Sequence, residues 1–542
     1  MAQVKTLDDT LRTDAGDGAA IITVRDPRTL KEIYSFREAS DTEIRQAFER
    51  ARAAHARISK LTVPQRLDEI RKLKRYFLAH KEQIIDRLVE ETGKARMDAL
   101  VAEVRAVLEI IDYYERHAAK FLSDQKVPTP PILFPKKSYI HYEPIGTVLI
   151  ISPWNYPLNL AMVPIITAFV AGNAVVFKPS EWTPLKGLIE DIVEKSGFMP
   201  DAITIVYGGK DTGRRLIDQR PAKILFTGST RAGKQIMEQA AQYLIPVELE
   251  LGGKDPMVVF DDVDIDRAAN GAMWGGMMNC GQTCTSVERV LVHERIYPQF
   301  VKTLAEKIEK LSHPAKREGR PDLGDQDVGH MTAPFQIEKV QELVDDARAK
   351  GAEIHTGGER VGDSHAFLPT LISNVNKDMR VVSEETFGPV ITVETFKTED
   401  EAIAMANDTP YGLSASVWSR DIERARRVAK SIETGNVSIN NVLATQGNAA
   451  LPFGGTKESG FGRYYGPHGL HSFSNVKSVL VDSGVALEVH WFPYTKEKYD
   501  LFSKLLDALY GGAPMKLWNL PQLLKVTAIG LQLQKLTKKI KL

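Results

Sequence analysis

Residues 147–178 read TVLIISPWNYPLNLAMVPIITAFVAGNAVVFK, a run with no charged side chain before its last residue. Pro153, Pro157 and Pro164 divide this run into pieces of strand and helix length. Proline interrupts regular backbone hydrogen bonding, and a bilayer span needs roughly 20 continuous apolar residues. We therefore predict a buried strand, a loop, a helix and a second strand here, in preference to a transmembrane helix.

Further short apolar runs follow this stretch, and helical stretches separate them. The runs lie at 147–151, 174–177, 203–206 and 224–226. This alternation is typical of a parallel sheet with crossover helices. A second pattern of the same kind begins after Glu250, with strands expected at 256–260 and 289–292. The predicted fold class is α/β, with a Rossmann-like cofactor domain and an α/β catalytic domain.

Length and composition narrow the class of protein. A chain of 542 residues is long enough for two or three domains, and 43% hydrophobic and 26% charged residues are ordinary for a soluble globular protein. Basic and acidic residues both number 70, so charge gives no case for a nucleic-acid partner. The N-terminus lacks the apolar segment of a signal peptide, and two cysteines suit a reducing compartment. We therefore predict a cytoplasmic protein.

Residues 41–121 have a helical, strongly charged pattern, which we interpret as scaffold. Asp41 offers an N-cap, and Thr92-Gly93-Lys94 ends the second of three expected helices. Several prolines between 128 and 135 then mark a linker. Residues 137–142 alternate like an exposed strand, which favours an edge or subunit-pairing hairpin.

A glycine-rich turn follows the run at 224–226. Phe226 to Lys234 reads FTGSTRAGK, so Gly228, Ser229 and Gly233 lie where a strand passes into a helix. Backbone N–H groups at such a junction suit the pyrophosphate of a dinucleotide. A simple strand-to-helix turn explains the glycines equally well, because the stretch departs from the usual G-x-G-x-x-G.

Charged residues follow another strand, at Lys178-Pro179-Ser180-Glu181. A carboxylate at a strand end commonly holds the 2′-hydroxyl of an adenosine ribose. Glu181 would repel a 2′-phosphate and so favours NAD over NADP, whereas Lys178 leaves NADP open. Without the other motifs, the two residues are only a charged loop.

Both cysteines, Cys280 and Cys284, lie downstream of Glu250. A thiol and a carboxylate can serve as a nucleophile and the base that resolves its adduct. The alternative is an inert core cysteine, the usual state of a buried thiol. The C-x3-C spacing without a second ligand cluster is a poor zinc site, so no metal is predicted.

Several motifs, taken together, identify a family resemblance. In chain order they are PWN at 153–155, KPSE at 178–181, FTGST at 226–230, ELGGK at 250–254, GQTC at 281–284, EETFGP at 384–389 and PFGGTKESG at 452–460. In this order they resemble the NAD(P)-dependent aldehyde dehydrogenase superfamily over roughly residues 20–485. The resemblance implies an enzyme that oxidises an aldehyde with NAD or NADP.

The resemblance also implies roles for particular residues. Cys284 matches the nucleophile that forms a thiohemiacetal and then a thioester, and Asn155 matches the oxyanion-hole amide. Glu250 matches the general base for hydrolysis, which favours release of a free acid over transfer to coenzyme A. Cys280 has no catalytic match and is expected in a wall of the substrate tunnel. The implied cofactor contacts are Trp154, Lys178, Ser180, Glu181, Gly228, Ser229, Gly233, Leu251, Glu385 and Phe387.

Later segments resemble the branch that contains the fatty, aromatic and coniferyl aldehyde dehydrogenases. Tyr464 stands where many other branches carry a glutamate after the arginine, and HWFPYT at 490–495 also looks like that branch. The implied substrate is a medium or long-chain aliphatic aldehyde, with an aromatic or coniferyl-type aldehyde as the alternative. Tyr113, Met162 and Tyr465 are side chains on which tunnel width is expected to depend.

The C-terminal tail gives a separate prediction. If residues 522–542 form a helix, Val526, Ile529, Leu533, Leu536 and Ile540 share one face, and lysines lie largely on the other. Such a helix can lie peripherally on an anionic membrane surface, or pack on the body or a partner subunit. Both alternatives stay open.

The predicted organisation has three parts and a tail. The cofactor domain comprises 1–123 and 145–251, the catalytic domain 252–453, the bridging segment 124–144 and 454–485, and the extension 486–542. The bridging segment is expected to pair subunits in a homodimer. Three other classes are alternatives: a non-catalytic, crystallin-like or scaffold descendant, a membrane-associated lipid-binding protein with a vestigial site, and a thioester-forming acyl transferase. The first would be expected to lose Cys284, Asn155 or Glu250, and all three are present. Neither of the other two accounts for Cys284, Asn155, Glu250 and the cofactor motifs together.

Overall fold

The computed structural model describes residues 12–14, 20–133, 135–316, 322–484, 488 and 490–512. The chain divides into two compact units. Unit 1 comprises residues 1–123 and 142–475, and unit 2 comprises residues 124–141 and 476–542. The predicted amphipathic helix at 522–542 lies outside the described residues.

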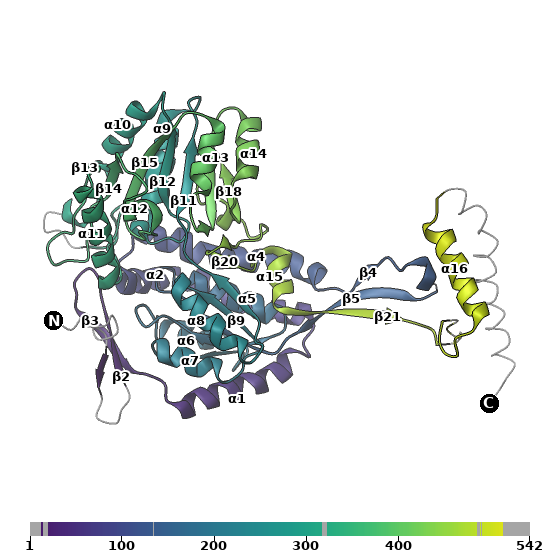
Figure 1. The fold of residues 1–542 in the computed structure, drawn as a ribbon. Helices are drawn as coiled ribbons and strands as arrows, with labels where there is room; N and C mark the ends of the chain where they lie inside the picture. The colour runs from purple at the N-terminus through teal and green to yellow at the C-terminus, as the bar shows by residue number, and fades with distance from the viewer. Residues whose placement is uncertain are drawn as a thin grey trace. The chain divides into compact units, whose positions relative to one another are not determined.

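The first sheet of unit 1 confirms the predicted parallel strands (Figure 1). Its strands are β6 (Thr147–Ile151), β7 (Ala174–Lys178), β8 (Ile203–Ile205), β9 (Lys223–Thr227), β10 (Val247–Glu250) and β20 (Gly460–Phe461). The order is β20-β10-β9-β6-β7-β8, and all but β20 run parallel. Parallel strands place their carboxyl ends along one edge, so the loops that follow them meet there.

Helices cover both faces of this sheet. α5 (Asn159–Val170) packs on β6 and β7, and beyond it lie α2 (Val63–Thr92) and α4 (Arg105–Phe121). α6 (Leu188–Lys195) packs on α2, while α1 (Asp41–Ile58), α7 (Lys210–Ile217) and α8 (Thr230–Ala241) form the other layer. Every residue of α5 after Asn159 is buried. Its uniformly apolar surface therefore belongs to a core helix, which explains the uncharged run.

Capping residues define where the outer helices begin. Ser40 accepts the Glu43 N–H and Glu43 accepts the Ser40 N–H, so Ser40 rather than Asp41 is the N-cap of α1. Gly93 ends α2 in the left-handed region, with φ of 72°. The chain then continues through α3 (Arg96–Asp98) and a π-helical turn (Ala99–Val104) into α4.

The second sheet of unit 1 has seven strands in the order β13-β14-β15-β12-β11-β17-β18. They are β11 (Asp255–Val259), β12 (Val287–His293), β13 (Glu353–Thr356), β14 (Thr370–Ser373), β15 (Val390–Phe396), β17 (Ser414–Trp418) and β18 (Asn436–Ile439). α9 (Ile265–Met277), α10 (Tyr297–Ile308) and α11 (Pro334–Ala349) pack with one apolar core. α13 (Glu399–Asn407) and α14 (Ile422–Ser431) pack with another.

Short elements complete unit 1. β2 (Ala20–Arg25) pairs with β1 (Arg12–Asp14) and β3 (Glu32–Arg37), and β16 (Tyr411–Gly412) pairs with β19 (Thr456–Lys457). α12 (Arg380–Ser383) and α15 (Gly466–Ser472) are short helices. Residues 454–475, part of the predicted bridging segment, therefore lie in unit 1, because β20 pairs with β10.

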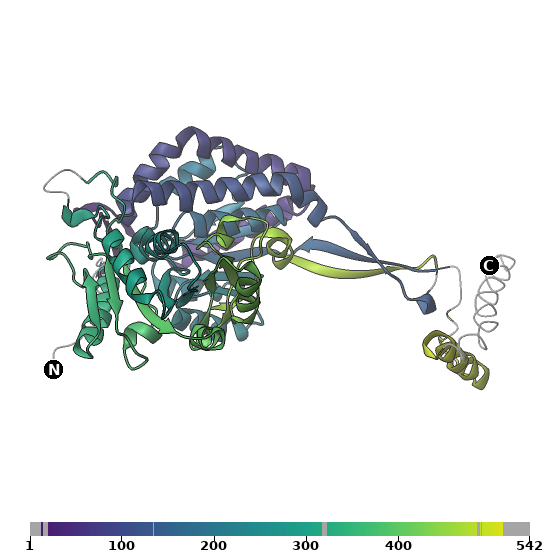
Figure 2. The ribbon, with the colours of Figure 1, turned by 90° about the horizontal axis from the view of Figure 1, so that it is seen from above.

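The described residues of unit 2 include a three-stranded sheet, a short 3-10 turn (Pro131–Leu133) and a longer helix (Figure 2). The sheet order is β21-β5-β4, with β4 (Gln125–Val127), β5 (Lys137–Pro144) and β21 (Ser474–Val481), and the helix is α16 (Lys496–Tyr510). Residues 142–144 and 474–475 of these strands belong to unit 1. Within the described residues, no helix combines the length and apolar character needed to cross a membrane.

Candidate active site

The carboxyl-end edge of the six-stranded sheet gathers several of the predicted site residues. Trp154 and Asn155 follow β6, Lys178 ends β7, Gly228 and Ser229 follow β9, and Glu250 ends β10. These strands are parallel neighbours, so residues far apart in the sequence come to one edge. This is the usual place for a ligand in an open α/β sheet.

Hydrogen bonds fix both ends of Asn155, which is buried at 3% exposure. Its Nδ2 donates to the Gln282 carbonyl at 3.0 Å, which ties the side chain to the loop before Cys284. Its own main-chain carbonyl accepts from Lys94 Nζ at 2.8 Å and from Asn279 Nδ2 at 3.1 Å. The amide therefore lies beside the cysteine loop in one fixed orientation.

The two cysteines have different environments. Cys284 is half-buried, whereas Cys280 has no accessible surface and belongs to an apolar core cluster. The prediction that Cys280 lines a tunnel is therefore wrong, because a tunnel wall needs accessible surface. Asn279 and Cys280 adopt φ of 54° and 56°, and this left-handed turn directs the chain toward Cys284.

The electrostatic environment of Cys284 disfavours the thiolate form of its side chain. Burial raises the pKa of this thiol, and the carboxyl groups of Asp255, Glu250 and Glu385 raise it further. Glu250 and Glu385 thus act on the same sulfur from opposite sheets. Any chemistry that starts from the thiolate must remove the proton or add positive charge nearby.

Glu250 is a buried carboxyl group without a protein partner. It is 3% exposed, and neither side-chain oxygen has a hydrogen-bond partner among the described residues. Burial raises its pKa well above the ordinary value, Glu248 raises it further, and Arg463 opposes the shift. In its deprotonated form, a carboxyl group with a raised pKa is a stronger base than an ordinary carboxylate, and its unused oxygens leave it suited to accept a proton from water.

The turn after β9 has the features expected of a phosphate-binding helix start. Ser229 caps α8, and its Oγ accepts the Ala232 N–H at 3.3 Å. A Cβ at Gly233 would lie 2.7 Å from the Leu251 side chain, so the glycine allows α8 to approach β10 closely. Gly228 and Ser229 thus lie at the positive end of a helix.

Lys178 and Glu181 lie together at the end of β7. Lys178 Nζ is 3.6 Å from Glu181 Oε2 and donates to the Pro179 carbonyl at 3.0 Å. Ser180 Oγ accepts the Trp182 N–H, which closes the turn. Lys178 and Ser180 are buried, and Glu181 is partly exposed. The ion pair orients the Glu181 carboxylate, and the Lys178 ammonium neutralises part of its negative charge.

Glu385 and Phe387 approach this edge from the seven-stranded half. Glu385 Oε1 accepts the Gly253 N–H at 3.1 Å, and burial raises the pKa of Glu385 to about 7. A Cβ at Gly252 would lie 2.5 Å from Glu385 Oε2, so a side chain at residue 252 would displace the Glu385 carboxylate. The Phe387 ring stands edge-on to Trp154, with centroids 5.4 Å apart. The ring pair joins the two sheets.

A buried ion pair that the sequence reading missed holds the Glu385 segment. Lys254 Nζ lies 2.5 Å from Glu288 Oε2 and donates to Thr386 Oγ1 at 3.0 Å. Glu288 also accepts the main-chain N–H groups of Thr386 and Phe387. Lys254 is the last residue of the ELGGK motif, so the sequence does mark this lysine. No sequence motif marks Glu288 as its partner.

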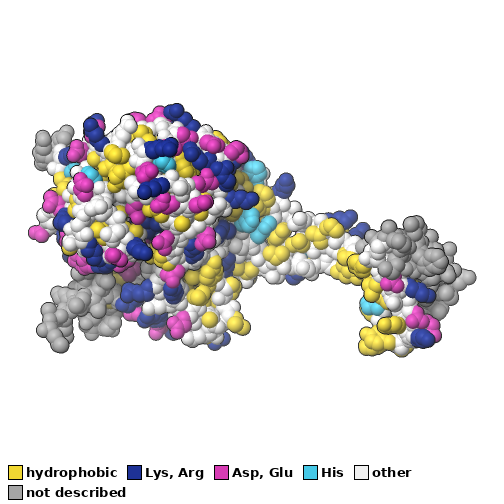
Figure 3. Space-filling model, turned by 45° about the horizontal axis from the view of Figure 1, so that its top comes forward, with side chains coloured by type: hydrophobic (Ala, Val, Ile, Leu, Met, Phe, Trp, Pro, Cys, Tyr) yellow, Lys and Arg dark blue, Asp and Glu magenta, His cyan; other side chains and the backbone are white. Residues whose placement is uncertain are grey.

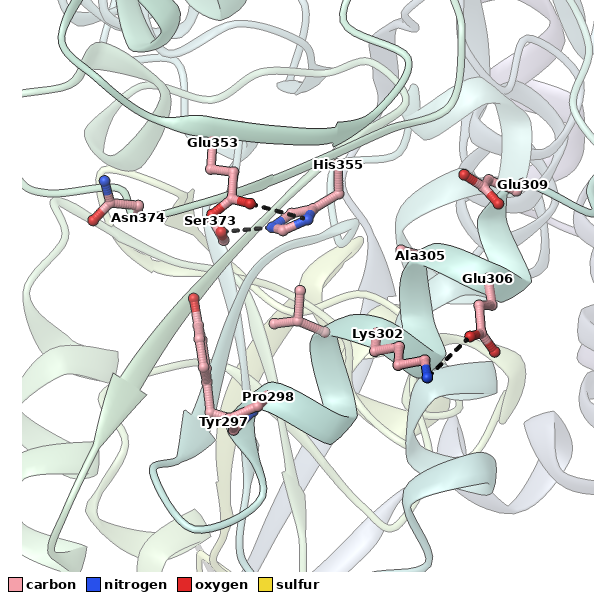
Figure 4. Close-up of a pocket in the computed structure, with 11 residues that line it drawn as sticks. Tyr297, Pro298, Lys302, Ala305, Glu306, Glu309, Glu353, His355, Ser373 and Asn374 are labelled. Atoms are coloured by element: carbon pink, nitrogen blue, oxygen red, sulfur yellow. Dashed lines mark hydrogen bonds and ion pairs between the residues drawn. The ribbon is translucent and has the colours of Figure 1, made fainter.

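A surface hollow lies away from these residues, between α10 and the edge strand β13 (Figure 4). Its volume is about 620 Å³. His355 Nε2 is 2.6 Å from Ser373 Oγ and His355 Nδ1 is 3.8 Å from Glu353 Oε1, so the histidine ties β13 to β14. None of the predicted catalytic or cofactor residues lines this hollow.

The residues at the sheet edge fit a dinucleotide. The α8 N-terminus, which directly follows Gly228 and Ser229, supplies main-chain N–H groups suited to a pyrophosphate. Glu181 follows β7 of the six-stranded sheet, and Glu385 precedes β15 of the seven-stranded sheet. Both carboxylates are suited to bind ribose hydroxyls. Among the described residues, no cluster of three or more His, Cys, Asp or Glu is arranged to hold a metal ion.

Sequence comparison identifies similar proteins. Residues 14–479 match the pattern described as "Aldehyde dehydrogenase family". The chain is 40% identical over 471 residues to a 4,4'-diapolycopene aldehyde oxidase from a Methylomonas species, covering 86% of this chain and 87% of that protein. It is 35% identical over 473 residues to the mitochondrial succinate-semialdehyde dehydrogenase of Oryza sativa, covering 86% and 87%.

Solved structures agree with the sequence comparison. The NAD+ complex of an aldehyde dehydrogenase from Bacillus cereus superposes with a TM-score of 0.80 at 33% identity, covering 85% of this chain and 93% of that chain. A betaine aldehyde dehydrogenase from Staphylococcus aureus, also solved with NAD+, gives a TM-score of 0.81 at 32% identity, covering 89% and 95%.

Proposed function

The chain belongs to the aldehyde dehydrogenase family as an NAD(P)-dependent enzyme, and we propose that it oxidises an apolar aldehyde to the carboxylic acid with water. The observation that supports this proposal is that three functional groups lie together at the carboxyl-end edge of the six-stranded sheet. They are the half-buried thiol of Cys284, the fixed amide of Asn155 and the carboxyl group of Glu250, which has no hydrogen-bond partner among the described residues.

The first half-reaction forms a covalent adduct on Cys284. The thiol proton leaves to solvent, the sulfur bonds to the aldehyde carbon, and the carbonyl π electrons move to oxygen. The side-chain N–H of Asn155 and the main-chain N–H of Cys284 stabilise that oxyanion. One such donor contributes about 3 kcal/mol to the transition state.

NAD(P), when bound, supplies the hydride acceptor that makes oxidation of the adduct to a thioester feasible. The residues that would hold it are Trp154, Lys178, Ser180, Glu181, Gly228, Ser229, Gly233, Leu251, Glu385 and Phe387. Glu181 disfavours a 2′-phosphate by charge repulsion, which supports a preference for NAD. The nearby Lys178 reduces that repulsion, so NADP remains a slower alternative.

The second half-reaction is hydrolysis. Glu250 takes a proton from water, the resulting hydroxide attacks the thioester carbonyl, and the Cys284–carbon bond breaks. The departing sulfur leaves with the bonding electron pair and takes the proton back from Glu250, so the products are the free acid, the regenerated thiol and the regenerated carboxylate. The same base argues for hydrolysis rather than acyl transfer to coenzyme A.

An apolar substrate is supported by the aromatic side chains beside Cys284. The ring centroids of Tyr464 and Tyr465 lie 4.6 Å apart, those of Phe453 and Tyr464 lie 5.5 Å apart, and Cys284 packs against the apolar cluster that contains all three. Met162 is fully buried and so lines no accessible channel, whereas Tyr113 is partly exposed. The Methylomonas relative is named for an aldehyde of diapolycopene.

The experiment compares rates of nicotinamide reduction with short aliphatic, long aliphatic and aromatic aldehydes, using NAD and NADP in parallel. We expect higher kcat/KM for the long aliphatic series with NAD, and no reduction by Cys284→Ser. An undiminished rate in Cys284→Ser, or no reduction with any aldehyde, would refute the proposed function. Preference for aromatic aldehydes would refute only the substrate class.

We also propose that unit 2 pairs two copies of the chain in a homodimer. β21 is an edge strand, and Val476, Leu480 and Val481 on it are 54%, 49% and 48% exposed. An apolar edge strand favours pairing with another chain. Val476→Lys with Leu480→Lys should shift the mass in solution from dimer to monomer, and an unchanged mass would contradict the pairing.

Peripheral membrane contact is a further proposal for unit 2. Figure 3 shows hydrophobic side chains over its strands and around α16, and Trp491, Phe492 and Tyr494 are 63%, 80% and 74% exposed. Aromatic side chains of this kind favour a membrane interface. Flotation with anionic liposomes should be stronger for the full chain than for one ending at Gly511. Equal flotation would refute a role for the tail.

A further inference from the structure

The main-chain carbonyl of Asn155 has two side-chain donors that the catalytic chemistry does not use. Lys94 Nζ donates to it at 2.8 Å and Asn279 Nδ2 at 3.1 Å. Lys94 is fully buried, 1% exposed, and comes from the helical layer that the sequence indicated only as scaffold. Burying an ammonium group costs free energy unless the group is paired with an opposite charge and hydrogen-bonded. The position of Lys94 therefore needs an explanation.

The partner of Lys94 is Glu103, which is also fully buried. Lys94 Nζ lies 2.5 Å from Glu103 Oε1 and 4.5 Å above the Tyr156 ring. Glu103 Oε2 accepts the main-chain N–H groups of Leu158 and Asn159, at 3.0 and 2.8 Å, where α5 begins. The Lys94–Glu103 pair therefore contacts the Asn155 loop at two places. Lys94 donates to the main-chain carbonyl of Asn155, and Glu103 accepts the main-chain N–H groups of Leu158 and Asn159.

The backbone is shaped for this contact. Glu103 lies in the π-helical turn Ala99–Val104, a rare geometry that recurs at functional sites. Gly93 has φ of 72°, and its carbonyl accepts the His330 N–H at 2.8 Å. Thr332 then links Thr92 to the cysteine loop, donating through Oγ1 to Thr92 O and through N to Gln282 Oε1, both at 2.8 Å. Lys94 is thus anchored to the same loop that Asn155 contacts.

Asn279 supplies the second donor from the opposite direction. Its Nδ2 contacts both the Asn155 and Gln282 carbonyls, each at 3.1 Å, and its main-chain N–H donates to Asp98 at 2.9 Å. Tyr156 and Thr283 hydroxyls lie 2.6 Å apart. The segment before Cys284 and the segment around Asn155 are therefore joined by several contacts, and Lys94 adds an ammonium donor at the Asn155 carbonyl.

We propose that Lys94 is a positioning residue for the Asn155 amide, holding the main-chain carbonyl so that the side-chain N–H faces the reacting aldehyde oxygen without rearrangement. This inference rests on the proposed role of Asn155 in stabilising the oxyanion. A preorganised donor stabilises charge at the moment of reaction, whereas a mobile one must first be oriented. Loss of Lys94 should therefore lower kcat/KM although Lys94 touches no substrate atom.

The test is a double-mutant cycle measured as kcat/KM for one aldehyde with saturating NAD. Asn155→Ala should reduce kcat/KM by about 10²–10³-fold. Lys94→Met, which keeps the length of the side chain but cannot donate, should reduce it by about 10–100-fold. If Lys94 acts through Asn155, the double variant should resemble Asn155→Ala alone, within roughly threefold.

Lys223 provides a control matched in environment. Its Nζ contacts Glu248 at 2.6 Å, the Ser472 carbonyl at 2.8 Å and the Phe473 ring at 4.9 Å, but not Asn155. Lys223→Met should lower the melting temperature as Lys94→Met does. Combined with Asn155→Ala, its effect on kcat/KM should multiply. Non-additivity specific to Lys94 would thus separate positioning from general loss of packing.

The same measurements distinguish failure of the oxyanion role of Asn155 from failure of the positioning role of Lys94. If Asn155→Ala leaves kcat/KM unchanged, the proposed oxyanion role is wrong. If Asn155→Ala has its effect but Lys94→Met multiplies with it, the positioning inference is wrong and the proposed function stands. Should Lys94→Met fail to fold, Lys94→Gln, which retains a neutral donor, enters the same cycle. It should likewise give no additional loss beyond Asn155→Ala, and a multiplied loss would overturn the inference.

Discussion

Glu250 and Glu288 are buried to nearly the same degree, 3% and 2%, but their surroundings differ completely. Glu288, on β12, is paired with Lys254 and accepts two main-chain N–H groups. Glu250, at the end of β10, has no hydrogen-bond partner on either oxygen within the part of the chain that the structure describes. A carboxylate with its partners present supports structure, whereas one without them is available to exchange a proton. The comparison therefore separates the supporting glutamate from the proposed base.

The largest expected effect is on turnover. Glu250→Gln keeps the shape but cannot accept a proton from water, so kcat should fall by about 10²–10⁴-fold. The fold should remain, because no hydrogen bond to the described protein is lost. Steady-state rates and thermal melting of the purified enzyme measure both quantities. Unchanged turnover would remove Glu250 from the mechanism.

Glu288→Gln should chiefly affect stability. It leaves Lys254 buried without its counter-charge, which should cost about 3–5 kcal/mol in the free energy of unfolding. The control is the double variant Lys254→Met, Glu288→Gln, in which no charge is stranded. Denaturant unfolding should show much of the stability restored in the double variant. A double variant as unstable as Glu288→Gln would contradict the assignment of the loss to the unpaired lysine.

The pH dependence of the free energy of unfolding gives a further test of the difference between Glu250 and Glu288. The folded-state pKa of Glu250 is raised above its ordinary value of 4.5, so protonated Glu250 favours the folded state fully below that value. This contribution is lost as pH rises through the raised pKa. Glu250→Gln should therefore be more stable than the wild type at alkaline pH, by about 1–3 kcal/mol. The difference should disappear at acidic pH; a difference independent of pH would show that Glu250 is not a buried titrating group.

The smallest expected effect concerns Cys280. Its thiol is fully buried in an apolar cluster, where cysteine behaves as a small hydrophobic residue. Cys280→Ala should cost about 1 kcal/mol or less of stability and leave kcat/KM unchanged. Aldehyde kinetics and thermal melting of Cys280→Ala test both parts. A large loss of activity would return Cys280 to the list of catalytic candidates.

Local sequence patterns were sufficient for the strands and for the motif residues. The runs at 147–151 and 174–177 are apolar throughout and form β6 and β7 within one residue of the predicted ends. Asn155, Glu250 and Cys284 follow strands or turns that short motifs mark. These features depend on residues close together in the sequence, so the sequence carries their signal.

Long-range contacts could not be predicted in the same way. Lys94 contacts Asn155, and Glu288 contacts Thr386, across many residues and between different elements. The order β20-β10-β9-β6-β7-β8 departs from chain order, and β20 comes from a segment predicted to bridge subunits. Cys280 and Cys284 share a motif but differ in burial, which depends on the core that surrounds each side chain. Such placements arise from tertiary packing, for which one sequence gives no pairing signal.

The most direct test of the account follows the acyl group on the enzyme. Glu250→Gln is mixed with NAD and an aliphatic aldehyde, and NADH is recorded from the first turnover while the protein is digested for peptide mass measurement. We expect one equivalent of NADH per active site and then a stall, with the acyl group attached to Cys284. Continued turnover without a covalent adduct, or an adduct on Cys280, would contradict the assignment of nucleophile and base.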